Sequence, residues 1–544
     1  MDMKKINIFY TIVLGALALT SCDDFLDKMP DNRASIDTEE KVTKILVNAY
    51  ATHNSNLILE MASDNARDNG STYSFQEQTQ QEAYLWQPIS GTDNDSSKDL
   101  WDACYGAVAA ANQALKAIDE MGNPASLQAE RGEALLCRAW GHFQLANVFC
   151  LAYNPETADR DLGLPYSMAP ETEVSPQYER GTMAELYAHI NADIEEALPL
   201  VNDKIYTVPK YHFNQKAAYA FAARFNLFYQ KWDKTIEYAN AALGSNPRNL
   251  LRDWNHIVNE LASDYETRCN AYISASENAN FLLQTAYSSS GYFLGAWNLG
   301  NRYGHEQPNI AKVETYRAPG IWGPWNSSSD LLMSHSCWGP TQTLNMSKYY
   351  GYFEYIDKVN GIGFRQTVYV QFCADETLLC RAEAYAVKND LASALRDMNL
   401  WLSTNSRNGM QATQQLVDSL YGPYHEKTET SAAYGMKYMD DGKGGPIAAS
   451  EYLGTPKKHL HPLGFTIGEE GSSQENMLQF ILHMRRCQMM QEGGRWCDIK
   501  RWGIEIAHNR DGMPDDLLLK DDPRRAFQLP NDVLDAGLTP NPRK

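Results

Sequence analysis

The feature that most constrains the fold of this chain is a helical hairpin pattern that occurs twice. Apolar residues follow Trp232 at steps of four, three and four, and the same steps follow Leu391. These steps place the apolar side chains on one face of an α-helix. In both places a helix rich in small and aromatic residues comes first, ending near Tyr229 and near Val387. Because one such hairpin cannot bury its apolar face alone, the pattern predicts a body of stacked helical hairpins.

Helical periodicity covers residues 98–247 and returns over residues 370–403. The string Leu-Leu-Cys-Arg-Ala occurs at 135–139 and again at 378–382, which indicates a third helix related to those of the two hairpins. The hairpins resemble tetratricopeptide-type units. The predicted fold class is therefore mostly α: a tetratricopeptide-like helical scaffold that carries loop-rich, partly irregular ligand-binding and C-terminal regions.

Two stretches of the chain lack helical periodicity. Residues 278–355 are rich in Gly, Ser, Asn and aromatic residues, and turn residues are frequent in residues 404–476. Loops this long inside a compact chain usually serve a function. We therefore predict that 278–355 is a loop-rich binding region with short strands, that 404–476 is an irregular insertion, and that 477–544 is a C-terminal motif region. Neither stretch has the composition of a flexible linker, so we expect residues 22–544 to form a single body.

The first residues have the layout of a bacterial lipoprotein signal. Lys4 and Lys5 precede an apolar stretch that ends at Leu19 and is too short to span a bilayer. Leu19-Thr20-Ser21-Cys22 resembles the lipobox, at which the signal is cut and the cysteine is lipidated. We expect residues 1–21 to be the signal peptide and Cys22 to be the lipidated residue, the alternative being an ordinary secretion signal. The acidic residues that follow resemble a surface-export signal, which predicts a lipid-anchored protein on the exterior of the outer membrane.

The net charge of the chain limits its possible ligands, and its cysteine content limits the number of disulfides. A formal net charge of −20 argues against nucleic acid as a ligand, because phosphate binding needs clustered Lys and Arg. Ten cysteines are too few for a dense disulfide framework in a chain of 544 residues. We expect them to be mainly small buried residues, as at Cys137 and Cys380 inside apolar helices. One or two disulfides remain open at this stage.

Several further strings lie in a fixed order along nearly the whole chain. They are Asp23–Pro30, Trp101–Tyr105, Gly132–Ala139, Gly163–Tyr166, Glu492–Gly503 and Asp522–Arg525. Together they resemble the SusD/RagB-type outer-membrane nutrient-binding lipoproteins. The sequence departs from that family's pattern at Gln371, Met484 and Gln488, where we expect altered local ion pairing and an unchanged fold. Charged residues beside Trp496 suit a packed, ion-paired helix end better than a catalytic cluster.

The resemblance implies a function and a partner. Members of this family lie as a lid on a SusC-like TonB-dependent outer-membrane transporter, capture an oligosaccharide or, in one branch, a peptide, and pass it into the barrel. The expected protein is therefore a non-catalytic oligosaccharide-binding lipoprotein of the outer membrane without a cofactor. The lipid at Cys22 would tether it beside its transporter. The alternatives are a peptide-binding member of the same family and, in a different class, a helical glycoside hydrolase.

Sugars present flat apolar faces edged by hydroxyls, so their sites need aromatic rings with polar side chains at the rim. The loop-rich stretch supplies both. The predicted ligand-binding residues there are Trp325, Tyr292, Trp297, Trp322, Asn326 and Arg302. Of these, Trp325 and Tyr292 match most closely the places where the starch-binding member of the family presents aromatic residues. A second polar and aromatic cluster lies in the loop before Trp101 and adds Asp64, Asn65, Arg67 and Tyr73.

The sequence gives weaker evidence for a catalytic or metal-binding site than for a sugar-binding site. The sequence has no His-Glu-x-x-His, no Gly-x-Ser-x-Gly and no phosphate-binding loop. A hydrolase needs only two carboxylates, however, which spacing cannot exclude in so acidic a chain. His459 and His461 lack nearby metal-ligand partners. We interpret Asp93, Asp95 and Asp99 as capping of the helix that begins near Lys98, since the glycine and glutamate of a calcium loop are absent. No metal is predicted. A helical adaptor that binds only protein would leave the aromatic loops unexplained.

Overall fold

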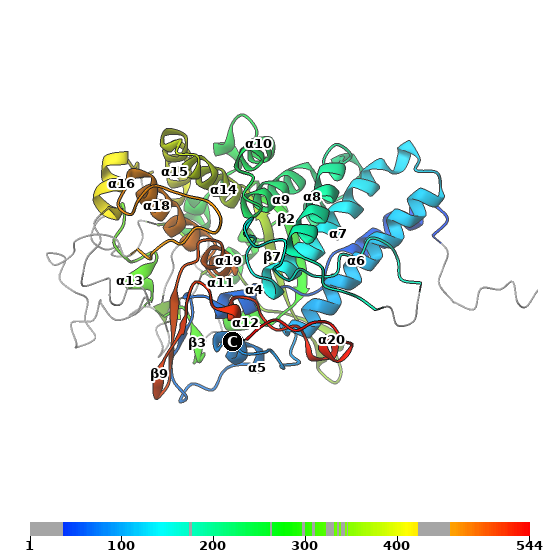
Figure 1. The fold of residues 1–544 in the computed structure, drawn as a ribbon, viewed down its shortest axis with the longest axis horizontal. Helices are drawn as coiled ribbons and strands as arrows, with labels where there is room; N and C mark the ends of the chain where they lie inside the picture. The colour runs from blue at the N-terminus through cyan, green and yellow to red at the C-terminus, as the bar shows by residue number, and fades with distance from the viewer. Residues whose placement is uncertain are drawn as a thin grey trace, which may run out of the picture.

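The computed structural model describes residues 36–172, 177–261, 264–295, 300–306, 310–322, 331–333, 337–338, 343–344, 346–407, 409–422 and 457–543. Its scaffold consists of α6 (Ser97–Glu120), α7 (Gln128–Phe149), α8 (Met183–Ala197), α9 (Gln215–Phe228), α10 (Trp232–Leu243), α14 (Ala374–Val387), α15 (Leu391–Asn405) and α18 (Ser473–Gln488). α7 packs between α6 and α8, and α10 packs between α9 and α14, which also contacts α15 and α18. Figure 1 shows this series running across the molecule from α6 to α16 (Gln414–Tyr421). The predicted fold class, mostly α and tetratricopeptide-like, is confirmed.

The arginine of the repeated string Leu-Leu-Cys-Arg-Ala is buried and has the same role in both helices. In α7, Arg138 donates from Nε and Nη2 to the two carboxylate oxygens of Asp193 on α8, at 2.7 and 2.6 Å. In α14, Arg381 makes the same paired contact with Asp397 on α15, at 2.7 and 2.9 Å. The α7 and α14 helices are therefore related in structure as well as in sequence, as the repeated string predicts.

A three-stranded antiparallel sheet lies against the scaffold. Its order is β2 (Asn280–Tyr287), β7 (Ile362–Cys373) and β6 (Tyr352–Asp357). The inner end of β7 is buried beside α9, and the ring of Phe372 lies 4.9 Å from that of Trp140 on α7. Within 278–355 the sheet takes in β2 and the first part of β6, whereas its longest strand, β7, lies beyond that range.

The remaining elements are short. The helices are α3 (Glu39–Leu46), α4 (Asn56–Ala62), α5 (Gln78–Tyr84), α11 (Tyr265–Tyr272), α12 (Ser290–Phe293), α13 (Lys312–Glu314), α19 (Gly494–Arg501) and α20 (Asn531–Asp535). The strands are β1 (Arg67–Asp68), β3 (Tyr303–Gly304), β4 (Cys337–Trp338), β5 (Thr343–Leu344), β8 (Ile506–Arg510) and β9 (Met513–Leu518). Within the predicted irregular insertion 404–476, α16 is a regular amphipathic helix that packs on α18.

The capping prediction for the start of α6 needs a correction. The N-cap is Ser96, whose Oγ accepts a hydrogen bond from the backbone N of Asp99 at 3.2 Å. Asp95 is not a cap, because its carboxylate turns away toward Ser288. Serine competes well with aspartate for this position, so the sequence alone could not rank the two.

The described cysteine side chains are all unpaired thiols, and all except the half-buried Cys497 are buried. Cys137 and Cys380 lie in α7 and α14 as small core residues, as predicted. Among the described residues, no helix combines the length and the apolar character needed to cross a membrane.

The C-terminal motif residues form a packed, ion-paired helix end, as the sequence indicates. Trp496 is fully buried in α19. Asp498 accepts hydrogen bonds from Arg485 and Arg501, and both arginines also pair with Glu383 of α14. These charges hold α14, α18 and α19 together and are closed to solvent.

Candidate ligand-binding site

The structure pairs one short strand from each of the two regions that the sequence singles out. β1 pairs with β3 in antiparallel register, Arg67 opposite Gly304 and Asp68 opposite Tyr303. The backbone N of Asn69 donates to the carbonyl oxygen of Arg302 at 2.8 Å. Segments more than two hundred residues apart in sequence, 67–69 and 302–304, therefore lie side by side.

Arg302 is held rigidly on this surface. Its Nε and Nη2 donate to the two carboxylate oxygens of Asp68 at 2.9 and 3.0 Å. Asp68 is buried, whereas Arg302 is partly exposed. A guanidinium fixed by a paired carboxylate loses less freedom when a ligand oxygen binds to its remaining N–H groups.

Three aromatic residues lie on the segments that lead to and from these strands: Tyr73 and Phe75 follow β1, and Tyr292 lies in α12 before β3. Phe75 is 37% exposed, and its ring lies 4.9 Å from that of Phe293, next to Tyr292 in the chain. Tyr73 and Tyr292 are partly exposed. We call Tyr73, Phe75, Tyr292 and Arg302 the aromatic loop cluster. Its rings and its fixed guanidinium are the chemistry that a sugar face with hydroxyls at its edge requires.

The backbone and one cation fix the position of Tyr292. The guanidinium of Arg365 on β7 lies 4.6 Å from the centre of the tyrosine ring, which is within the range of a cation–π contact. A Cβ at Gly351 would lie 2.7 Å from Cε2 of the ring, so only glycine leaves room for it there. Phe75 and Arg365 are residues that the sequence interpretation missed. Phe75 lies two residues beyond the predicted Tyr73, but nothing in the sequence connects Arg365 with these loops.

Asp64 and Asn65 lie beneath the loops in the protein interior. They are 6% and 1% exposed. The carboxylate of Asp64 pairs with Arg495 at 2.8 Å and Lys458 at 2.7 Å, and Arg486 lies 3.3 Å away. Burial alone would raise the pKa of Asp64, but the three cations more than compensate and hold it well below its usual range. Their position makes both residues anchors of the 64–73 loop.

The other predicted residues are placed as follows. Trp322 is partly buried, its Nε1 donates to the carbonyl oxygen of Ala318 at 2.7 Å, and its ring packs 5.7 Å from His483. Arg67 is partly exposed, with Nε 3.7 Å from Glu306. Cys22, Trp297, Trp325 and Asn326 lie outside the described residues.

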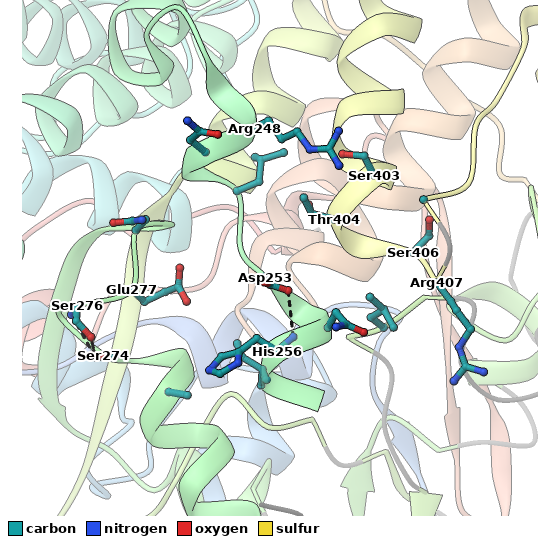
Figure 2. Close-up of a pocket in the computed structure, with 18 residues that line it drawn as sticks. Arg248, Asp253, His256, Ser274, Ser276, Glu277, Ser403, Thr404, Ser406 and Arg407 are labelled. Carbon is teal, nitrogen blue, oxygen red and sulfur yellow. Dashed lines mark hydrogen bonds between the residues drawn. The ribbon is translucent and has the colours of Figure 1, made fainter. Parts of the chain in front are cut away.

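A second candidate surface is a polar cavity of about 790 Å³ between the segment after α10 and the end of α15. Figure 2 shows Arg248 and Ser403 at one end, Glu277 and its neighbouring serines on one side, and Arg407 on the other. The lining includes the carboxylates of Asp253 and Glu277 but no Trp, Tyr or Phe. It can form hydrogen bonds with hydroxyls, but its described lining offers no aromatic plate for a sugar ring.

Two groups of side chains carry atoms of the kinds that bind metal ions. His459 forms an ion-pair contact with Glu470, Nδ1 to Oε1 at 2.9 Å, and its ring centre is 6.5 Å from that of His461. Among the described residues, these side chains do not form a group of three whose ligand atoms lie close enough together to share a metal ion. Glu77, Asp93 and Asp95, in contrast, place one oxygen each within 4.8 Å of one another.

Comparisons with known proteins agree with this fold. A SusD-like family model described as "Starch-binding associating with outer membrane" matches residues 24–227. A SusD superfamily protein of Bacteroides thetaiotaomicron VPI-5482 is 15% identical, with a TM-score of 0.60 over 92% of this chain and 98% of its own. A putative sugar binding protein of Bacteroides vulgatus ATCC 8482 is 15% identical, with a TM-score of 0.62 over 94% and 99%.

A structure described as a laminarin binding SusD-like protein is 14% identical, with a TM-score of 0.53 over 93% of this chain and 99% of its own. No curated protein matches the sequence. At these identities the solved structures establish a shared fold and leave the ligand of this chain to its own residues.

Proposed function

We propose that this chain is a SusD-like protein that binds oligosaccharides without catalysing a reaction on them. Its fold is shared with SusD superfamily proteins, and a SusD-like family model matches residues 24–227. The observation that carries the proposal is the pairing of β1 with β3, which brings Arg302 next to the segment that carries Tyr73 and Phe75. Aromatic rings beside a fixed guanidinium suit the apolar face and the hydroxyl edge of a sugar. Sugar-binding and laminarin-binding proteins among the similar structures support this ligand class.

We also propose a cellular location and a partner for this protein. Cys22 carries the lipid, the protein faces the exterior of the outer membrane, and a SusC-like TonB-dependent transporter receives the captured oligosaccharide. The lipobox-like string and the description "associating with outer membrane" of the matching family model support this location. In this arrangement the lipid tether keeps the binding protein at a high effective concentration beside its transporter.

Calorimetric titration of the mature chain with a panel of glycans tests the ligand class. For a glycan that binds, we expect Tyr292→Ala and Phe75→Ala each to weaken binding by about 1–3 kcal/mol, because each variant removes a ring from the contact. Trp325→Ala is expected to do the same, since the sequence places it in the same binding region. Phe353→Ala is the matched control: this ring on β6 is also 37% exposed but lies outside the aromatic loop cluster.

Three results would contradict the proposal. Equal losses in the Phe353→Ala control would mean that the cluster has no special role. Binding of peptides and not of glycans, lost in the same variants, would favour the peptide-binding alternative. New reducing ends on a glycan, abolished by Asp253→Asn or Glu277→Gln in the polar cavity, would identify a hydrolase.

A further inference from the structure

Three carboxylates converge directly behind the Tyr292 turn. Glu77 precedes α5, whereas Asp93 and Asp95 lie in the loop before α6, and one oxygen of each lies within 4.8 Å of the others. Two oxygens bound to one Ca²⁺ at 2.3–2.6 Å lie at most about 5 Å apart. The spacing of these three oxygens therefore fits one shared cation.

The charge of this group is poorly balanced by protein. Among the described side chains, Arg365 pairs with one of the three carboxylates: its Nη1 lies 3.2 Å from Oε1 of Glu77, and no cation pairs with Asp93 or Asp95. Three ionised carboxylates and one guanidinium leave an excess of two negative charges. A bound divalent cation would compensate this excess.

Thr79 gives independent evidence of a ligand. It is fully buried, and its Oγ1 has no hydrogen-bond partner. A Cβ built on Gly91 would lie 2.5 Å from this hydroxyl oxygen and 3.0 Å from Oδ2 of Asp93, so both oxygens point into the same space over Gly91. A buried hydroxyl without a partner costs free energy and calls for an explanation. Oε2 of Glu77 is likewise buried without a partner.

We infer that Glu77, Asp93, Asp95 and the hydroxyl of Thr79 form a binding site for a divalent cation, of which Ca²⁺ fits best. All the candidate ligands are oxygens, which hard cations prefer, whereas zinc sites usually contain His or Cys. Ca²⁺ also tolerates an irregular ligand geometry, which suits side chains drawn from two separate segments. Water would complete the coordination shell.

The site would brace the segment that carries Tyr292. Asp95 accepts hydrogen bonds from Oγ of Ser288 at 2.6 Å and from the backbone N of Ser289 at 2.8 Å. Oγ of Ser289 also donates to Oε1 of Glu77 at 3.1 Å. A cation that fixes these two carboxylates therefore fixes the turn from Ser288 into α12. That the cation strengthens glycan binding follows only if the proposed function is correct, whereas cation binding itself does not depend on it.

The test is calorimetric titration of the chelator-treated mature protein with CaCl₂, with MgCl₂ in parallel. We expect one saturable Ca²⁺ site per chain and a higher melting temperature in Ca²⁺. Asp95→Asn and Asp93→Asn should each weaken Ca²⁺ binding by about 10- to 100-fold or more, as losses around metal sites do. Asp99→Asn is the matched control, because it removes the same charge from the same stretch of chain but lies outside the group.

Thr79→Val keeps the shape of the side chain and removes only the hydroxyl. We expect it to fold normally, because that hydroxyl has no partner, and to bind Ca²⁺ about 10-fold more weakly. The inference is overturned if the native protein takes up no Ca²⁺ at millimolar concentration, or if Thr79→Val and Asp93→Asn bind it as tightly as native. Ca²⁺ binding without any glycan binding would refute the proposed function and leave this site standing.

Discussion

At the residue scale, Asp64 is the carboxylate that Lys458, Arg486 and Arg495 share in the protein interior. A run of Asp, Asn and Arg in a loop has the composition of a ligand-binding rim, and the same composition serves an interior ion-pair cluster. The partners of Asp64 lie far away in sequence, with Arg486 and Arg495 in the C-terminal helices. No local pattern connects them, so the burial of Asp64 could be known only from the fold.

Asp64→Asn should destabilise the protein by about 3–5 kcal/mol, because it leaves the buried charges of Arg486, Arg495 and Lys458 without their shared carboxylate. Guanidinium unfolding measures this loss. Asp119→Asn serves as the control, since this partner of Arg131 has a side chain that is 61% exposed. Surface pairs contribute at most about 1 kcal/mol. A loss for Asp64→Asn no larger than in the control would contradict the buried cluster.

The difference in stability between the native protein and Asp64→Asn should also depend on pH. The pKa of Asp64 is lower in the folded than in the unfolded state, where it is about 3.9. Its carboxylate therefore contributes stability at pH values above about 4, and this contribution is lost as the pH falls through the folded-state pKa. The stability gap between native and Asp64→Asn should stay constant from about pH 5 to 8 and narrow only in stronger acid.

At the element scale, an arginine paired with one asparagine and one aspartate joins three helices in each half of the scaffold. Nη1 of Arg138 donates to Asn112 on α6, and Nη1 of Arg381 donates to Asn240 on α10. Each arginine thus connects a preceding helix through an asparagine and a following helix through an aspartate. The repeated string predicted a related helix, but its asparagine and aspartate partners lie at different sequence distances in the two halves, so the full motif is visible only in the structure.

Asp397→Asn and Asp193→Asn should therefore have similar effects, each destabilising by about 3–5 kcal/mol through an unpaired buried arginine. Replacing both partners of one pair, as in Arg381→Met with Asp397→Leu, should recover much of this loss because no buried charge remains. Chemical denaturation of the single and double variants forms the test. Asp233→Asn, whose side chain is 85% exposed beside Lys388, should change little. A double variant less stable than Asp397→Asn alone would show that the pair stabilises by more than charge compensation.

Sequence reasoning succeeded for elements where a local period decided the outcome. The helices from α6 to α10 and the α14–α15 hairpin follow the 3.6-residue period of their apolar residues. It failed where partners come from a distance. β2 packs against β7 and α9, and Arg302 meets the segment that carries Tyr73 through the pairing of β1 with β3. The sequence could list Tyr73 and Arg302 as separate candidates, but that their segments lie side by side is visible only in the structure.

At the scale of the whole molecule, the first and last parts of the described chain interlock. The backbone N of Gln491 donates to Oε1 of Glu60 at 2.8 Å, and Nζ of Lys500 donates to the carbonyl oxygen of Asn147 at 2.9 Å. Arg180 donates to Oδ1 of Asn541 at 2.7 Å. Such contacts between distant segments mean that neither end can unfold without exposing buried polar groups in the other.

The candidate site depends on the same long-range contacts. Asn509 of β8 donates from Nδ2 to the carbonyl oxygen of Asp68 at 2.8 Å, and Oδ2 of Asp511 accepts from the backbone N of Ser71 at 2.8 Å. The β8–β9 hairpin thus supports the 64–73 loop from the C-terminal region. A ligand on the aromatic loop cluster would consequently be coupled to the stability of both ends of the chain.

Differential scanning calorimetry of the mature chain should show this coupling as one unfolding transition. A glycan at 100 times its Kd adds about 2.7 kcal/mol to the stability of the folded state. For a chain of this length the unfolding entropy is about 1 kcal/mol/K, so the transition should move up by about 2–3 °C as a whole. Two separate transitions, of which the glycan moves only one, would mean that the binding loops belong to an independently folding part. Because Asp64 joins the 64–73 loop to α18 and α19, Asp64→Asn should lower the midpoint of that single transition and leave it single.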